Sequence, residues 1–290
     1  MTGQECVHDR EARVESIARL LPPIYEDLRL VDVARLRRII RLGAYEGHTG
    51  GLAVGRLQAS LVVVPRSFAS DFHRFCISNP KACPLVAVGR AGSPLMPTLG
   101  DVDVRTDIPQ YEVYRFGELI RQQPDILDIW RQDLAAFALG SSSTFEHALI
   151  ERGVAPRNFV VHRVAPMFRS SIRTTRVGVF GGDMVVSMRP VRLSQVDTVR
   201  AVTARFPHAH GAPIHVGDPR VIGIEDIGDP DWGDAVEVRE GEVPVFWASG
   251  ATAQSVVAGA RLELAIVQTP GHMLITDVAA RENVGAFKIY

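Results

Sequence analysis

The stretch from Leu61 to Gly89 constrains the fold more than any other part of the chain. It begins with a short apolar run rich in β-branched residues, LVVVP at 61–65, and ends with a second apolar run, PLVAVG at 84–89. Between them, apolar residues recur at helical spacing over 68–76, which predicts a helix between two buried strands. This order is typical of an α/β layer with at least some parallel pairing.

Further helices and strands are predicted before and after this stretch of the chain. Apolar spacing predicts a helix at 14–21, and Asp32 is expected to cap a second helix that runs through Ile40. The elements expected after Tyr111 are an exposed strand and turn at 111–119, helices at 125–139 and 142–151, strands at 159–164 and 184–188, a helix at 194–206, and short strands at 221–226, 235–240, 243–248, 262–268 and 272–277.

The length and composition favour two domains. The chain has 290 residues, of which 46% are hydrophobic, enough for a large core. The pattern changes near Tyr111, yet neither a low-complexity linker nor a repeat of fixed period is visible. We therefore predict an α/β fold with a mixed sheet and helices in a main domain, residues 1–113 plus 191–290. A smaller α+β domain, residues 114–190, is expected as an insertion.

Charge and composition narrow the partners and the compartment. A formal net charge of -1 gives no field that would gather nucleic acid or anionic lipid. No apolar run reaches the length of a membrane span, and the first residues lack the features of a signal peptide. Three cysteines are too few for a disulfide framework. We expect a cytoplasmic protein that binds a small molecule, without nucleic-acid or membrane partners; a homo-oligomer is compatible with the sequence.

The segment HAHGAPIHVGDP, residues 208–219, contains three histidines and an aspartate, and Pro213 and Pro219 are expected to stiffen the turns that present them. His210, His215 and Asp218 are candidates for proton transfer, because imidazole titrates near neutrality. The same side chains are good ligands for a divalent metal, but their spacing matches no established metal site. We therefore expect no metal and no cofactor, and a purely structural role for these residues stays open.

Two further segments could bind a carboxylate. DVRTDIPQY brings Arg105, Asp107 and Tyr111 together, so the arginine could hold a carboxylate while Asp107 orients it or acts as a base. VVSMRP places Ser187 and Arg189 at the end of an apolar strand, where sites in α/β sheets often lie. The alternative for the first segment is an internal Arg–Asp pair that closes a turn.

Other motifs are weaker. TPGHMLITD contains His272 and Asp277, and GHTGGLAVGRLQ supplies Thr49 and Gln58 from a glycine-rich loop whose N–H groups could cradle an anion. Neither matches a nucleotide-binding motif. Glu146 follows a run of hydroxyl residues and is either a catalytic carboxylate or an ordinary helix-surface acid. The default role of that run, 141–144, is helix capping, and that of Cys76 and Cys83 is buried packing.

Taken together and in this order, the motifs from Gly47 to Asp277 resemble one family, the hydro-lyases that include the D-glutamate cyclases. The resemblance implies two linked α/β domains and the loss of water from a small carboxylic acid; in the cyclases, D-glutamate closes to 5-oxo-D-proline. The residues shared with the family motifs are Gln58, Arg105, Asp107, Tyr111, Glu146, Arg189, His210, His215, Asp218, His272 and Asp277.

The chain also departs from the family pattern at four positions. Members of the family usually carry cysteine where this chain has Ser141 and Ser249, asparagine where it has Ser60, and histidine where it has Gln268. These changes imply a different amino or hydroxy acid as substrate. The alternatives are a hydratase or hydrolase acting on a cyclic amide or enol acid, and a non-catalytic relative that binds a small acid.

The expected site therefore divides into two groups. Proton transfer is assigned to His210, His215, Asp218, His272 and Asp107, and substrate binding to Arg105, Tyr111, Arg189, Gln58, Thr49, Glu146, Ser187 and Asp277.

Overall fold

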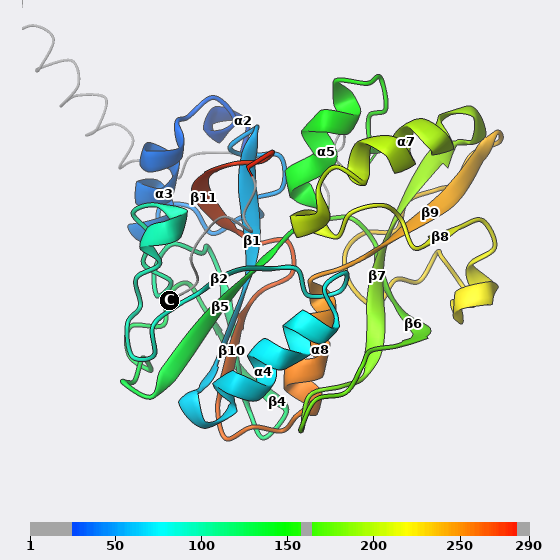
Figure 1. The fold of residues 1–290 in the computed structure, drawn as a ribbon. Coiled ribbons are helices and arrows are strands. Elements are labelled where there is room, and N and C mark those ends of the chain that lie inside the picture. Colours follow the sequence, from blue (N-terminus) through cyan, green and yellow to red (C-terminus); the bar gives the residue numbers. More distant parts are fainter. Residues whose placement is uncertain (1–24, 158–163, 283–290) are drawn as a thin grey trace, which may run out of the picture.

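The computed structural model describes residues 25–157 and 164–282 (Figure 1). The helix expected at 14–21 lies outside the described residues, as does the strand expected at 159–164 except for its last residue. Among the described residues, none of the helices is both long and apolar enough to span a lipid bilayer.

Two antiparallel sheets form the frame of the molecule (Figure 1). The larger sheet has the strand order β2 (Leu85–Val88), β5 (Leu134–Gly140), β1 (Arg56–Pro65), β10 (Ala265–Gln268), β3 (Tyr111–Arg115) and β4 (Glu118–Gln123), with β11 (Leu274–Ala279) also paired to β1. The smaller sheet has the order β6 (Met167–Arg173), β7 (Asp183–Arg192), β9 (Glu242–Ala248) and β8 (His215–Val216).

Helices cover the sheets and join their strands. They are α2 (Tyr25–Leu28), α3 (Val33–Arg41), α4 (Arg66–Ser78), α5 (Ser143–Ile150), α7 (Val196–Thr203) and α8 (Ala251–Gly259), with short 3-10 turns η1 (Pro97–Leu99), η2 (Leu193–Gln195), η3 (Pro207–Ala209) and η4 (Pro219–Ile222). Asp32 caps α3, as predicted, by accepting a hydrogen bond from Arg35 N. The α4 helix packs Phe72 and Phe75 into the apolar layer formed by alternate residues of β1 and β5.

The mixed α/β class is confirmed, but the expected parallel pairing is wrong. Every strand pair in the described residues is antiparallel. The strands β1 and β2, separated in sequence by α4, do run in the same direction, because each is antiparallel to β5. However, β5 inserts between them, so the strand–helix–strand order does not produce a parallel ladder.

The helix expected at 125–139 is also wrong, since residues 125–133 are turns and irregular backbone. Residues 134–140, LAAFALG, form the strand β5, which is buried along its whole length between β1 and β2. Alanine and leucine favour helices in isolation, but burial on both faces of a central strand overrides that preference. The strands expected at 221–226 and 235–240 are a 3-10 turn followed by irregular backbone, and irregular backbone, respectively.

The sheets group the chain differently from the predicted domain boundaries. Strands β4 and β5 fall within residues 114–190 yet belong to the larger sheet, while β8 and β9 lie beyond residue 190 and belong to the smaller one. The division into a main and an inserted domain stays a prediction. A boundary drawn from strand pairing would lie after β5 and again after β9.

The two sheets contain a repeated unit that the sequence did not reveal. In each, a ten-residue strand pairs with a seven-residue strand that leads directly into a helix: β1 with β5 and α5, and β7 with β9 and α8. The register agrees, since Ala59 pairs with Gly140 in one unit and Val186 with Ala248 in the other. The number of residues from β1 to β7 differs from the number from β5 to β9, so the repeat has no fixed period.

Candidate functional site

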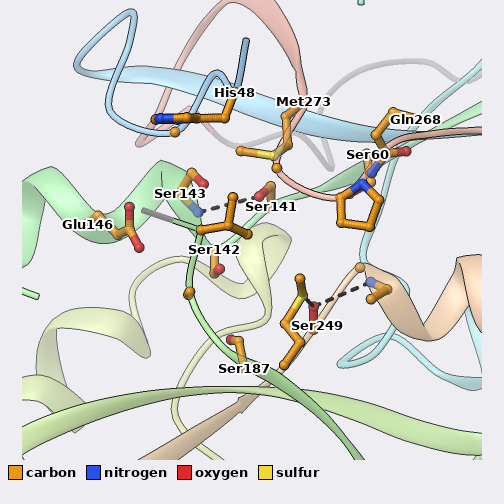
Figure 2. A pocket seen from close by; sticks show the side chains of 18 of the residues that line it. His48, Ser60, Ser141, Ser142, Ser143, Glu146, Ser187, Ser249, Gln268 and Met273 are labelled. Atoms are coloured by element: carbon orange, nitrogen blue, oxygen red, sulfur yellow. Dashed lines mark hydrogen bonds between the residues drawn. The ribbon is translucent and has the colours of Figure 1, made fainter. Parts of the chain in front are cut away.

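A pocket of about 80 Å³ lies between the two repeated units and receives side chains from both (Figure 2). Its wall includes the start of α5, the start of α8, and residues from β1 and β7. The lining residues are Tyr25, His48, Gly50, Ser60, Ser141, Ser142, Ser143, Glu146, Val164, Ala165, Met167, Ser187, Arg189, His210, Ser249, Gly250, Ala251, Gln254, Gln268, Pro270, Gly271 and Met273. Its size suits a small molecule.

The first corner of the pocket is the junction of β5 and α5. Ser141 N donates to Gln58 O of β1 at 2.9 Å, and the buried Thr144 hydroxyl accepts from Gln58 N at 3.1 Å. These bonds hold the helix start against the neighbouring strand. The Ser141 hydroxyl accepts a weak hydrogen bond from Ser143 N at 3.4 Å. As a result the serines at 141–143 are presented to the pocket (Figure 2).

The second corner, between β9 and α8, repeats these contacts. Ser249 N donates to Val185 O of β7 at 3.0 Å, and the buried Thr252 hydroxyl accepts from Val185 N at 3.0 Å. The Ser249 hydroxyl accepts from Ala251 N at 3.3 Å. A Ser-x-x-Thr sequence thus builds the same junction twice, and both helices begin at the pocket wall.

A buried ion pair lies beside the first corner. Arg189 donates from Nε and Nη2 to Glu146 Oε1, at 3.1 and 2.6 Å, and both side chains are at most 5% exposed. Arg189 also donates to the hydroxyls of Ser187 and Ser142, at 3.1 and 3.0 Å. The positive charge is therefore matched by Glu146, and the guanidinium arranges hydroxyl groups around the pocket.

His210 offers an unusual imidazole to the same pocket. Its Nδ1 lies 2.8 Å from Lys81 O, and a carbonyl can only accept, so Nδ1 carries the proton in the neutral ring. The buried Nε2 has no hydrogen-bond partner among the described residues. His210 lines the pocket, whereas Lys81 does not.

The protonation state of His210 follows from its surroundings. Burial lowers the pKa of this imidazole to about 4, and the positive charges of Arg189 and Lys81 act in the same direction. The ring is neutral at physiological pH, with a lone pair on Nε2. Its backbone also has a left-handed φ of 74°, which is uncommon for a residue other than glycine and frequent at functional sites.

Four of the thirteen predicted site residues line this pocket: Glu146, Ser187, Arg189 and His210. The other nine predicted residues do not line it. Asp107 is fully buried and accepts from Arg41 Nε and Nη2 at 2.7 and 2.8 Å, while Asp277 accepts from Arg37 Nη2 at 3.0 Å. The Asp277 pair fastens α3 to β11 of the larger sheet, and the Asp107 pair fastens it to the loop before β3.

The remaining DVRTDIPQY residues close turns. Arg105 is paired with Asp103 at 2.7 Å, which matches the internal Arg–Asp alternative in kind but with a different aspartate. The Tyr111 hydroxyl is fully buried and donates to Val104 O at 2.8 Å. Burial raises the pKa of this phenol well above its ordinary value. Neither side chain lines the pocket.

Thr49 and Gln58, the residues predicted from the glycine-rich loop, do not line the pocket. Thr49 donates to Met273 O at 3.0 Å, and Gln58 Nε2 donates to Thr49 O and Leu52 O at 3.0 and 2.8 Å. Both side chains are buried. They fix the loop that carries His48 and Gly50 to the pocket.

The other predicted proton-transfer residues do not join His210. His215 Nε2 lies 2.7 Å from Asp218 O, and the Asp218 carboxylate pairs with Arg220 at 3.0 Å on the surface. His272 has both ring nitrogens against backbone carbonyls, those of Pro270 and Glu46. None of the three lines the pocket, so a single site that includes them all is not formed.

Several pocket residues were missed by sequence reasoning. The sequence predicts only helix capping for the serines at 141–143, and none of its motifs indicates Tyr25, His48 or Gln254. A usable signal was present: Ser60, Ser141, Ser249 and Gln268, the four positions at which the chain departs from the family pattern, all line this one pocket (Figure 2). Within the described residues, no group of three or more His, Cys, Asp or Glu side chains is placed to hold a metal ion.

Comparisons with known proteins show which family the chain resembles. Residues 135–277 match the family model for D-glutamate cyclase. The chain is 52% identical to a "Putative hydro-lyase" of Jannaschia sp. (strain CCS1), over 86% of this chain and 94% of that protein. It is 51% identical to a protein of the same name from Verminephrobacter eiseniae (strain EF01-2), over 88% and 94%.

Among solved structures, a nitrogen repressor-like protein from Methanococcus jannaschii aligns with 84% of this chain and 98% of its own, at 8% identity and a TM-score of 0.37. This similarity is too weak to support an inference about function.

Proposed function

This chain belongs to the hydro-lyase family that includes the D-glutamate cyclases, and we propose that it removes water from a small carboxylic acid bound between α5 and α8. The finer form of the proposal is the intramolecular closure of a glutamate-like amino acid to a 5-oxoproline-like lactam. We place this reaction in amino acid metabolism in the cytoplasm, a setting that fits the free thiols of Cys76 and Cys83.

The observation that carries the proposal is His210. A neutral imidazole in the pocket wall whose Nε2 lone pair has no partner can take a proton from a bound substrate. Most buried polar atoms have a partner, so an unpartnered nitrogen in a pocket wall indicates that the partner arrives with the ligand. A carboxylate nearby would also stabilise the imidazolium once it forms.

In the cyclising form, the neutral amine of the substrate attacks the carbon of the protonated distal carboxyl group. The new C–N bond forms, and Nε2 of His210 accepts the proton that the nitrogen releases. The C–O bond then breaks, and the oxygen departs as water after receiving that proton from the imidazolium. Holding amine and carboxyl in one small pocket supplies the proximity that a slow intramolecular reaction requires.

The Arg189–Glu146 pair supports this chemistry indirectly. Because Arg189 is already paired, it is less suited to grip a substrate carboxylate than the sequence suggested. It fixes the hydroxyls of Ser142 and Ser187 instead, and these can hydrogen-bond to the substrate. The hydroxyl-lined wall is the expected source of substrate selectivity.

The test is a panel of D- and L-glutamate, related amino acids and hydroxy acids, incubated with the purified protein and analysed by mass spectrometry. We expect a product lighter by one molecule of water, and its absence with His210→Gln. If no acid on the panel loses water, the lyase proposal fails. Incubation with the cyclic amides would reveal the reverse reaction.

A further inference from the structure

The two corners of the pocket share a backbone but differ in charge. Glu146 lies two residues after Thr144 in α5, and its counterpart two residues after Thr252 in α8 is Gln254. Both side chains line the pocket and both are at least nine-tenths buried. The repeat therefore places a carboxylate at one helix start and a neutral amide at the other.

This difference decides where an anion is stabilised. The amino end of a helix carries a partial positive charge, which favours negative groups in the first turn. In α5 that place is taken by Glu146, which Arg189 holds. The first turn of α8 contains no acidic residue. Its N-cap is Gly250, which has no side chain to satisfy the exposed N–H groups.

The donors at the start of α8 have weak partners or none: the Ser249 hydroxyl donates only to the thioether sulfur of Met167, at 3.2 Å. Among the described residues, no acceptor receives the backbone N–H of Gly250, and Ala251 N has only a 3.3 Å contact with the Ser249 hydroxyl. A Cβ built on Gly250 would lie 2.5 Å from the Ser60 hydroxyl, so the backbone comes unusually close to β1 at this point. His210 lines the same pocket, is 1% exposed, and has no hydrogen-bond partner for its Nε2 among the described residues, which independently indicates a ligand there.

We propose that residues 249–251, at the start of α8, bind the carboxylate of the ligand through the backbone N–H groups of Gly250 and Ala251 and the hydroxyl of Ser249. The ligand's other polar end then lies toward Glu146 at the α5 corner. This assignment rests on the proposed function for the identity of the ligand as a carboxylic acid, but the binding step can be measured without turnover.

The chain contains a single Ser–Gly step, Ser249–Gly250. Labelling serine with carbonyl ¹³C and glycine with ¹⁵N therefore isolates the Gly250 amide in an NMR spectrum. The probes are butyrate and its neutral counterpart butyramide. We expect the Gly250 amide signal to move in a saturable way with butyrate and to stay in place with butyramide.

Two matched variants test the charge argument. Gln254→Glu puts a carboxylate in the first turn of α8, as in α5, and we expect butyrate affinity to fall about tenfold or more. Gln254→Met loses the same hydrogen bond to Gln268 O without adding charge, and its affinity should stay within about threefold of wild type.

The outcomes separate this proposal from the lyase proposal. The proposed subsite is wrong if the Gly250 amide signal does not move with butyrate, or if the Gln254→Glu and Gln254→Met variants bind butyrate with equal affinity. Either result would hold even if the protein removes water from an acid. A Gly250 signal that responds as expected supports the subsite even if no acid on the turnover panel reacts.

Discussion

At the scale of single residues, the environment of a histidine matters more than its presence in a motif. His208, His210, His215 and His272 all come from polar loop motifs, but only His210 faces the pocket. The ring of His208 is bound through Nε2 to Ala280 O at 2.9 Å. What distinguishes His210 is the combination of a fixed Nδ1 proton and an unpartnered Nε2.

Replacing His210 should remove catalysis while leaving the fold in place. His210→Gln retains a side chain that can donate to Lys81 O but cannot accept a proton at neutral pH. We expect kcat to fall by about 10²–10⁴-fold with a smaller change in KM. Steady-state kinetics on the reacting acid measure both. His208→Gln is the control, and an equal loss of kcat in it would argue against a specific role for His210.

Lys81 should tune His210 from outside the pocket. Its carbonyl accepts the Nδ1 proton, and its ammonium group donates to Ala212 O, two residues beyond His210. The positive charge of Lys81 is one cause of the lowered pKa of His210. In Lys81→Met the pKa of His210 should rise. On acidification, the activity of this variant should therefore begin to fall at a higher pH than that of wild type.

The measurement is the pH dependence of kcat/KM, whose acid limb reports ionisation of the free enzyme. Lys81→Arg keeps the charge and should restore the wild-type acid limb. Coincident profiles for wild type and Lys81→Met would show that Lys81 does not act on His210.

Glu146, Ser187, Arg189 and His210, which the sequence predicts as site residues, line the pocket, but the sequence did not reveal their partners. Arg189 was expected to hold a substrate carboxylate, and in the structure it binds Glu146. Asp107 could not be recognised as a structural residue, because its partner Arg41 lies 66 positions away in the chain. A sequence shows which side chains are capable of chemistry, whereas long-range ion pairing decides which are already engaged.

At the scale of elements, the repeated Ser-x-x-Thr corner explains how the pocket is built. Each threonine hydroxyl accepts from and donates to the backbone of one neighbouring residue: Thr144 with Gln58 at 3.1 and 3.4 Å, and Thr252 with Val185 at 3.0 and 3.1 Å. Valine has the same shape but no hydroxyl, so it would leave a buried N–H group without a partner.

We therefore expect Thr144→Val and Thr252→Val to lower the free energy of unfolding by similar amounts, about 1–3 kcal/mol each. Urea denaturation measures both. The exposed Thr175, which is bound only through its backbone, is the control, and Thr175→Val should stay within about 0.5 kcal/mol of wild type. A large effect at one corner and none at the other would contradict their equivalence.

The same scale shows where sequence patterns fail. The helix at α4 and the cap of α3 were predictable, because amphipathic spacing and an N-cap are local signals. The strand β5 was not, since LAAFALG has the composition of a helix and becomes a strand only through pairing with β1 and β2. The repeat was hidden for a similar reason: it is conserved in register and contacts, not in spacing along the chain.

At the scale of the whole molecule, the pocket depends on both sheets. Ser60 and Ser187 occupy equivalent places in β1 and β7, and they line the pocket from opposite units. The mixed α/β class follows from alternating helical and strand patterns. The antiparallel pairing does not, because it depends on β5 returning between β1 and β2.

Burial of neutral histidines should make the stability of the whole molecule depend on pH. Burial lowers the pKa values of His208, His210 and His272 relative to an exposed imidazole, that of His210 to about 4. The unfolded chain binds a proton near pH 6.5, whereas the folded chain does not until the pH reaches the lower value. The stabilisation is complete above the unfolded pKa and is lost as the pH falls toward the folded one.

For His210 alone, the loss amounts to at most about 3 kcal/mol between the two pKa values. Urea denaturation of wild type at about pH 7 and about pH 5 should show a lower free energy of unfolding at the acidic value. In His210→Gln the difference between the two should shrink, because one of the buried imidazoles is gone while the carboxylates are unchanged. An equal difference in both proteins would mean that His210 is solvated or protonated in the folded state, which would also remove it as the base in the pocket.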